Sequence, residues 1–156
     1  MKLLKKLHLP TLPADAWTPT ALAYEPPVYE SAVTVRVVPG PQEEYFIAAG
    51  LDTFFSASYE ISPNSDRMGL RLEGPEIESH SGTDIVSDGI VFGSIQVPSG
   101  GKPILLMADH QTAGGYAKIG TVLSLDLPKL AQARPGDTVQ FVRISAEDAQ
   151  ALYERK

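Results

Sequence analysis

Short runs of alternating apolar and polar residues dominate the chain, and turn residues separate them. The segment AVTVRVV from Ala32 alternates in this way, is rich in β-branched residues and ends at the turn PGP at 39–41. The later segment TVQFVRIS places Val139 and Phe141 on one face. Both patterns predict strands with one buried face. Further strands are predicted at ASYEIS, MGLRLEG, GIVFGSIQVP, KPILLMAD and IGTVLSLDL.

Helical spacing occurs in fewer places. In QEEYFIAAGLDTFFSA the large apolar residues recur near helical spacing behind two acids, which predicts a helix from about Gln42 to Phe54, with Gly50 near its end or at a break. LPKLAQ predicts a single turn or a short helix. AEDAQALYERK follows Ser145, a potential N-cap, and predicts a short terminal helix. About eight strands with one or two short helices indicate a mainly β protein, either a barrel or a sandwich.

Composition fits this picture of many short strands. The chain has 156 residues, of which 43% are hydrophobic and 21% are charged, and these values are typical of one globular domain. Its 13 glycines and 13 prolines suit strands joined by tight turns. Prolines are dense in residues 1–30, which predicts an extended lead or linker there and a single domain over residues 31–156.

Charge and the rarer residue types argue against several functions. A formal net charge of -6 disfavours nucleic acid as a partner. The absence of cysteine excludes disulfides, thiolate metal sites and a cysteine nucleophile. The histidines, His8, His80 and His110, stand singly, so we expect no metal site. No apolar run is long enough for a signal peptide or a membrane span, so we expect a cytoplasmic protein with no membrane partner.

Polar residues with chemical potential concentrate in three segments. The first is SPNSDRMGLRLEGP at 62–75, which begins with the composition of a turn. In one interpretation Asp66 accepts backbone hydrogen bonds and Arg67 lies in solvent. In the other, Arg67 lies at the mouth of a barrel, where its planar fork holds a carboxylate. The sequence leaves both open. Arg36 and Arg71 are expected to be outward-facing strand residues.

The second segment, GSIQVPSGG at 93–101, places Gln96 inside an otherwise apolar run. Burying an amide without a partner costs about 1–3 kcal/mol, so we expect Gln96 to be hydrogen-bonded. Its partner is either the backbone or a polar ligand, and the sequence does not choose between them.

The third segment, ADHQTAGGYAKI at 108–119, follows the apolar run PILLMA, which predicts a buried strand ending at Asp109. Gln111 and Thr112 then offer an amide and a hydroxyl. The glycine pair 114–115 permits positive φ and close approach of the backbone, and Tyr116 adds a ring and a second hydroxyl. This cluster indicates either a loop that binds a polar ligand or a glycine-containing turn.

Taken in order, three motifs resemble the C-terminal half of the C subunit of 5-oxoprolinases: SPNSDRMGLRLEGP, GSIQVPSGGKPILLMADHQTAGGYAKIGTV and DLPKLAQARPGDTVQF. These proteins belong to the KipA-like, allophanate hydrolase subunit 2 group, also called the biotin-dependent carboxyltransferase-like family. The resemblance covers roughly Val33 to Ile144. It implies a cyclophilin-like β-barrel, which fits the strand count, with an amide-reading site at the barrel mouth.

The resemblance also implies which side chains form that site. Arg67 is expected to bind a carboxylate or orient a carbonyl, and Gln96 and Gln111 are expected to read an amide. Thr112 and the backbone of the glycine pair are expected to donate to a developing oxyanion. The residues implied as catalytic are Arg67, Gln111 and Thr112, and those implied as substrate-binding are Asp66, Met68, Gln96, Asp109, Gly114, Gly115 and Tyr116.

For function, the resemblance implies one lobe of an enzyme complex, inactive alone. Such a lobe works with a KipI-like B subunit in the ATP-dependent hydrolysis of 5-oxoproline to glutamate, or forms part of a carboxyltransferase of the urea carboxylase type. Neither ATP nor biotin is expected to bind this chain, because partner subunits or domains supply both. The implied partners are the KipI-like B subunit and the N-terminal half of the C subunit itself, and a homo-oligomer stays open.

Two alternatives come from other functional classes. A non-catalytic KipA-like module would engage a KipI-like partner without turnover. A peptidyl-prolyl isomerase is suggested by the fold alone, and the chain lacks the constellation of arginine, phenylalanine and histidine that would support it. The chain also departs from the family pattern at Ala113, where relatives often have threonine, and at Ala117, where proline is usual. These departures predict either a looser loop or a weaker site.

Overall fold

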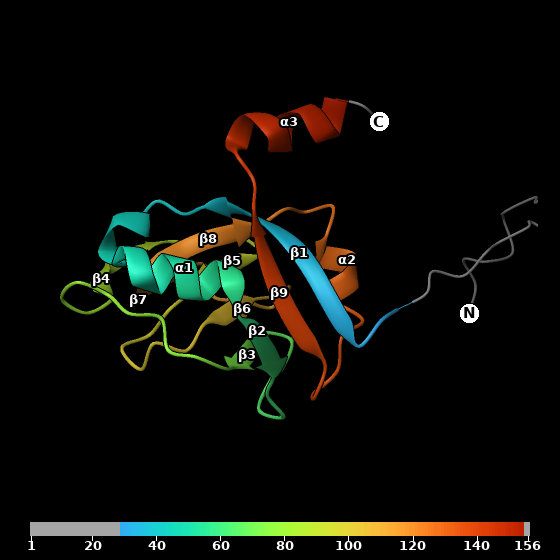
Figure 1. Ribbon diagram of the computed structural model, residues 1–156, viewed down its shortest axis with the longest axis horizontal. Helices are drawn as coiled ribbons and strands as arrows, with labels where there is room; N and C mark the ends of the chain where they lie inside the picture. The colour runs from blue at the N-terminus through green and yellow to red at the C-terminus, as the bar shows by residue number, and fades with distance from the viewer. Residues whose placement is uncertain (1–28, 155–156) are drawn as a thin grey trace, which may run out of the picture.

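The computed structural model describes residues 29–154, and in this part of the chain seven strands close into a barrel (Figure 1). The order around the barrel is β1-β8-β5-β6-β3-β2-β9, and β4 and β7 form a separate two-stranded sheet. The strands are β1 (Ala32–Pro39), β2 (Ser58–Ile61), β3 (Gly69–Glu73), β4 (Asp84–Gly89), β5 (Ser94–Gln96), β6 (Ile104–Leu106), β7 (Ala113–Tyr116), β8 (Lys118–Val122) and β9 (Thr138–Arg143). The helical segments are the 3₁₀ turn η2 (Glu43–Tyr45) and the α-helices α1 (Ala48–Ser56), α2 (Leu127–Leu130) and α3 (Ala146–Glu154).

The mainly β barrel predicted from the sequence is confirmed, with three short α-helices where one or two were expected. Parallel pairing of β1 with β9 closes the barrel and places Val35 opposite Phe141. Val35 and Val37 of β1 are fully buried, and Val139 and Phe141 of β9 are buried beside them. The alternation in both segments therefore produces two strands with one face in the core.

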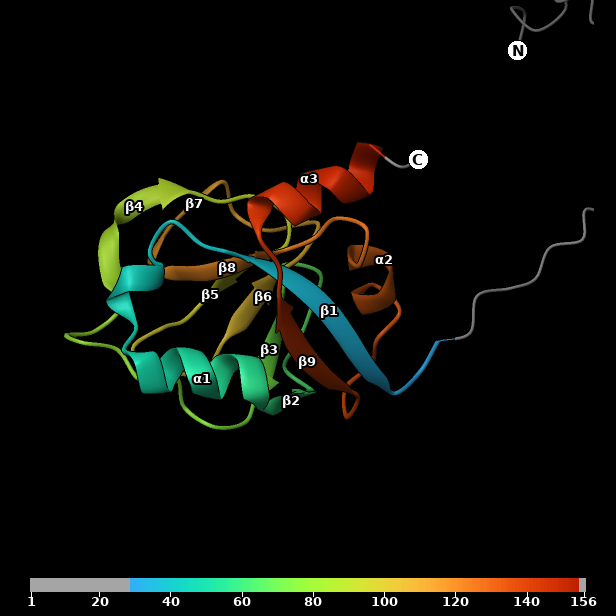
Figure 2. The ribbon, with the colours of Figure 1, turned by 45° about the horizontal axis from the view of Figure 1, so that its top comes forward.

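Helix α1 lies along one side of the barrel, over β9 (Figure 2). Phe54 of α1 stacks on Phe141 of β9 with a centroid separation of 4.5 Å, and Tyr59 of β2 packs beside both rings. All three side chains are almost completely buried. Aromatic burial on this scale makes the contact a major source of stability for the fold.

The single helix predicted from Gln42 to Phe54 is wrong. The segment forms η2, then an extended connection, and then α1. Phe46 is 3% exposed, its N–H donates to the Glu43 carbonyl at the end of η2, and its backbone is extended and bridges to Ser79, so the helix does not continue through it. Gly50 lies in the first turn of α1 and not at its end. Any side chain there would clash with the carbonyl of Glu78, so the close approach of these two segments requires glycine. Tertiary contacts thus override the helical spacing.

The C-terminal helix was predicted correctly, whereas β4 was missed. The Ser145 hydroxyl accepts a hydrogen bond from the Asp148 N–H at 3.0 Å, which is the N-cap expected before α3. Strand β4 shows no alternation of burial, and its Val86 is 93% exposed, so no hydrophobic pattern reveals it.

Two further findings concern the ends of the chain and membranes. Most of the proline-rich lead predicted over residues 1–30 lies outside the described residues. Among residues 29–154, none of the helices is both long and apolar enough to cross a bilayer.

A partly buried ion pair attaches the start of α2 to β1. The carboxylate of Asp126 is 2% exposed and receives Nε and Nη2 of Arg36, each at 2.7 Å. The Arg36 backbone N–H donates to the same carboxylate at 2.9 Å. Burial alone raises the pKa of Asp126, but the hydrogen bonds from Arg36 and Lys129 outweigh it and hold this pKa below its ordinary value. Arg36 is therefore a structural residue as well as an outward-facing one.

Candidate functional site

The amide side chains singled out from the sequence lie on the outer face of the barrel, over β3, β6 and β5. Leu72, Leu105 and Ile95 of these strands belong to the core. Because side chains alternate along a strand, Arg71 and Gln96 face outward. A cavity of about 400 Å³ lies on this face, and we call it the outer-face cavity. It is lined by Asp66, Met68, Gly69, Arg71, Gln96, Pro98, Ile104, Leu106, Gln111 and Tyr116.

Gln96 is anchored in the wall of this cavity. The side chain is 2% exposed, and its Nε2 donates to the backbone carbonyl of Tyr116 at 3.3 Å. The sequence left open whether Gln96 bonds to the backbone or to a polar ligand. In the structure its partner is the backbone, and this bond connects β5 to β7. The second N–H and the carbonyl oxygen of the amide are not used in this bond.

Gly114 lies against both amides. A Cβ placed on it would be 2.7 Å from Gln96 Nε2 and 3.4 Å from Gln111 Nε2. Glycine at this position thus lets the two carboxamides approach the same backbone segment. The exposed Gln111 and the buried Gln96 line the same cavity, and their role in reading an amide stays a prediction.

The glycine pair lies in a strand and not in a loop. Residues 113–116 form β7, paired with β4, and neither Gly114 nor Gly115 has a positive φ. The buried strand before them also ends at Leu106, short of the predicted Asp109. Ala117, where the resemblance led us to expect proline, donates its backbone N–H to the Thr83 carbonyl at 2.7 Å, a bond that proline lacks the donor to make.

Thr112 and the backbone expected to stabilise an oxyanion are not brought into the cavity. Thr112 is exposed, and its backbone carbonyl accepts the Ile90 N–H at 3.0 Å. Thr112, Gly114 and Gly115 are all absent from the lining of the outer-face cavity. Their role as oxyanion donors stays a prediction.

Arg67 lies apart from the amides, at an end of the barrel. Its Nε and Nη2 hold the carboxylate of Asp109 at 2.7 and 3.2 Å in a bidentate pair. These hydrogen bonds raise the pKa of the Arg67 guanidinium above its ordinary value. The carboxylate that Arg67 holds in the structure is therefore one of the chain's own side chains.

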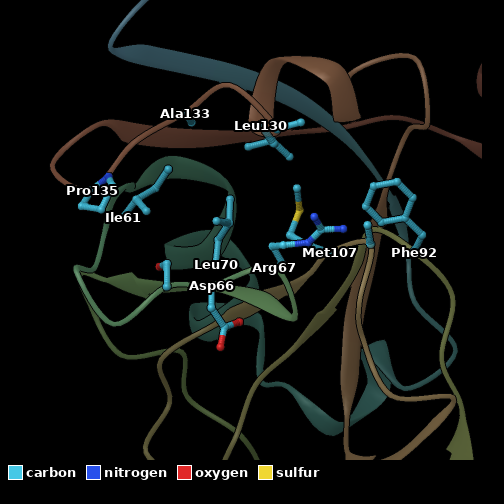
Figure 3. A pocket seen from close by; sticks show the side chains of 12 residues that line it. Ile61, Asp66, Arg67, Leu70, Phe92, Met107, Leu130, Ala133 and Pro135 are labelled. Atoms are coloured by element: carbon cyan, nitrogen blue, oxygen red, sulfur yellow. The ribbon is translucent and has the colours of Figure 1, made fainter.

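Arg67 lines a second cavity of about 500 Å³, which we call the barrel-end cavity (Figure 3). Apolar side chains make up most of its wall, among them Leu130, Met107 and Phe92. The Asp66 carboxylate points away from these side chains in Figure 3. Its Oδ1 accepts the backbone N–H groups of Met68 and Gly69 at 2.8 and 3.1 Å, which is the turn role in the first of the two interpretations that the sequence left open.

The side chains that the resemblance implied for one site at the barrel mouth thus lie in two places. The mouth holds Arg67 and an apolar cavity, whereas Gln96, Gln111 and Tyr116 line the outer face. The face could not be located from the sequence, because the side of the barrel on which an amide lies depends on which strands pair.

Two cations on the outer face were missed. Lys118 of β8 is 4% exposed, and its Nζ pairs with Asp88 of β4 at 2.7 Å. Gln42 joins this pair: its Nε2 donates to Asp88 and its Oε1 accepts the Lys118 N–H. The hydrogen bond from Lys118 is the main reason why the pKa of Asp88 lies below its ordinary value. This network holds the β4–β7 sheet against the barrel.

Arg71 is the second missed cation. It faces outward and is exposed, as predicted, and it also lines the outer-face cavity. The outward direction of the Arg71 side chain could be predicted from its position between the core residues Leu70 and Leu72. No signal in the sequence showed that β7 walls this face.

No cluster of three or more histidine, aspartate or glutamate side chains suited to a metal ion occurs among residues 29–154. The side chains that line the outer-face cavity offer hydrogen bonding by amides, a phenol and a guanidinium. Such a set recognises small polar molecules that contain an amide or a carboxylate.

Comparison with known proteins gives a consistent result. The family described as carboxyltransferase domain, subdomain A and B, matches residues 2–143. The chain is 40% identical over 121 residues to the C subunit of 5-oxoprolinase from Haemophilus influenzae, a match that covers 78% of this chain and 39% of that protein. It is 38% identical over 115 residues to the C subunit of 5-oxoprolinase from Escherichia coli, covering 74% and 37%.

A solved structure extends the comparison to the fold. The crystal structure of the Kluyveromyces lactis urea carboxylase matches 83% of this chain and 12% of its own, with 26% identity and a TM-score of 0.75. The chain spans 39% and 37% of the length of the two curated relatives named above. On the match of the family over residues 2–143, the chain belongs to the carboxyltransferase domain, subdomain A and B, family.

Proposed function

We propose that this chain is the amide-binding lobe of the C subunit of a 5-oxoprolinase. The observation that carries the proposal is the pairing of Gln96 and Gln111 beside Gly114 in the outer-face cavity. The higher sequence identity to the C subunit of 5-oxoprolinase, 40% against 30% for the urea amidolyase of Lachancea kluyveri, supports this choice of reaction.

The chemistry of a lactam matches a carboxamide. In 5-oxoproline the ring holds the amide cis, so its N–H and its C=O lie on the same edge. A glutamine side chain likewise presents an N–H and a C=O on one edge. The two groups therefore form a pair of parallel hydrogen bonds. Gln111 is proposed to make both bonds, and Gln96 offers the N–H and oxygen that its bond to Tyr116 leaves over.

The reaction of this complex would be ring opening. Water adds to the lactam carbonyl, the C–N bond of the ring breaks, and the product is glutamate. In our proposal the chain's own part is to bind the lactam and hold its carbonyl in one orientation, which lowers the entropic cost of reaction. Hydrogen bonds preorganised toward the carbonyl oxygen also stabilise the charge that develops there.

We assign the use of ATP to a KipI-like B subunit. The outer-face cavity, at about 400 Å³, offers one guanidinium and the carboxylate of Asp66, a poor fit for a triphosphate. A biotin-dependent transfer, as in urea carboxylase relatives, would likewise need biotin from another domain. The N-terminal half of the C subunit is the second partner that the proposal requires.

Reconstitution tests the proposal. The full chain is combined with a KipI-like B subunit and the N-terminal half of a C subunit, and ATP-dependent glutamate formation from 5-oxoproline is measured. We expect turnover only with all components, and a loss of about tenfold or more with Gln111→Leu, which removes two hydrogen bonds. The matched control is Gln132→Leu, an exposed glutamine after α2.

Two results would count against this assignment. Carboxylation of urea without turnover of 5-oxoproline would assign the chain to the carboxyltransferase reaction instead. Tight binding of the KipI-like partner without any turnover would favour the non-catalytic binding module.

A further inference from the structure

A row of four residues crosses the outer face of the barrel. The strand register pairs Arg71 of β3 with Ile104 of β6, Ile104 with Gln96 of β5, and Gln96 with Lys118 of β8. Cross-strand partners point to the same side of a sheet, and neighbouring strands lie about 4.8 Å apart. The row thus places a cation at each end and an amide between them.

The two cations differ in whether they are neutralised. Lys118 is buried and paired with Asp88 at 2.7 Å. Arg71 forms no ion pair with any residue from 29 to 154, and no side-chain hydrogen bond of its guanidinium is found there. Among the arginines and lysines of this part of the chain, only Arg134 shares this property, and it lies outside the cavity. Arg71 is therefore the available cation of the outer-face cavity.

The other charged groups nearby do not take its place. The Arg67 guanidinium, which the sequence suggested as the carboxylate binder, is occupied on its fork by Asp109. Asp66 is the one acid in the lining of the outer-face cavity over residues 29–154, and its Oδ1 is engaged by two backbone N–H groups of its own turn. An anion in the cavity thus finds its strongest partner at Arg71, two strands from Gln96.

We propose that Arg71 binds the carboxylate of a cyclic amide acid whose amide is held by Gln96 and Gln111, so that the cavity selects an anionic lactam over a neutral amide. This inference rests on the proposed function and adds a specificity-determining residue to it. A guanidinium matches a carboxylate through two parallel hydrogen bonds, and charge-assisted bonds of this kind are stronger than neutral ones.

The test compares two ligands that differ only in the carboxylate. The full chain is titrated with 5-oxoproline and with 2-pyrrolidinone, followed by NMR. We expect 5-oxoproline to bind about tenfold or more tightly, and Arg71→Gln to reduce the difference to within about twofold. The affinity for 2-pyrrolidinone should stay unchanged in this variant, which shows that the cavity is intact. Arg134→Gln is the matched control and should keep the full preference.

Each other outcome has a defined meaning. If Arg71→Gln keeps the preference for 5-oxoproline, or weakens both ligands equally, the role of Arg71 is refuted while amide binding stands. If 2-pyrrolidinone binds and the carboxylate adds nothing in the wild-type chain, the same conclusion holds. If neither ligand shifts any signal of the cavity at millimolar concentration, both the inference and the proposed function fail.

Discussion

At the scale of single residues, the absence of a side chain at Gly114 shapes the candidate site. Its neighbours are the far ends of two flexible side chains, Gln96 Nε2 and Ile90 Cδ1, each 2.7 Å from the position that a Cβ would take. A methyl group there must displace the amide or the isoleucine methyl, because real Cβ atoms do not approach so closely. Gly115 has no such neighbours within residues 29–154, since its nearest atom there is the Ile85 carbonyl oxygen at 3.5 Å.

We therefore expect Gly114→Ala to lower the affinity for 5-oxoproline by about tenfold while lowering the free energy of unfolding by about 1 kcal/mol, the low end of the cost of an added methyl group. The displaced atoms are flexible, so the fold adapts more easily than the cavity. Gly115→Ala is the control and should bind normally. Titration and urea unfolding of both variants check this, and equal binding by the two would contradict the position of Gln96 in the site.

At the scale of elements, two ion pairs attach peripheral segments to the barrel. Arg36 and the buried Asp126 join α2 to β1, whereas Lys118 and Asp88 join β4 to β8. Each pair has one almost completely buried member, Asp126 in the first and Lys118 in the second. Removing the exposed partner leaves a charge in a poorly solvated place, which is costly.

For the first pair, Arg36→Met should destabilise the fold by about 2 kcal/mol, less than for a fully buried pair because Arg36 is about one third exposed. The pKa of Asp126 is lower in the folded chain than in the unfolded chain. The stabilisation from its carboxylate is therefore fully present above the unfolded pKa and is lost as pH falls through the folded pKa. Urea unfolding at neutral and acidic pH measures both effects. The difference between wild type and variant should shrink in acid, and a constant difference would contradict the role of the carboxylate charge.

For the second pair, Asp88→Asn should loosen the β4–β7 sheet, because it leaves the Lys118 ammonium buried without a counter-charge. We expect faster backbone hydrogen exchange in β4 and β7 at neutral pH, with little change in the barrel strands. Asp84→Asn, an exposed acid on the same strand, is the control. Unchanged exchange in Asp88→Asn would show that the ion pair does not hold this sheet.

At the scale of the whole molecule, two cavities of residues 29–154 bear on the candidate site, and Asp66 lines both of them. The barrel-end cavity is mainly apolar, with Arg67 neutralised by Asp109. The outer-face cavity holds the amides and Arg71, which forms no ion pair within residues 29–154. Our account assigns substrate binding to the outer face, which differs from the position at the barrel mouth that the sequence suggested.

Much of the barrel could be predicted from the sequence, because alternation in β1 and β9 reflects burial of Val35 and Phe141 directly. The helix boundary near Phe46 could not, since a distant partner, Ser79, decides its conformation. Gln96 and Gln111 were identified because an amide in or beside an apolar run is unusual. Arg71 was not, because the difference between a solvated face and a cavity wall depends on the packing of β7.

The most direct test of the central claim is to map where 5-oxoproline binds on the full chain, by following the NMR signals of both cavities during a titration. Our account predicts saturable shifts at Gly114 and at the side-chain amides of Gln96 and Gln111, with the barrel-end residues Leu130 and Ala133 unaffected. Shifts confined to Leu130 and Ala133 would contradict the outer-face site and would return substrate binding to the barrel mouth.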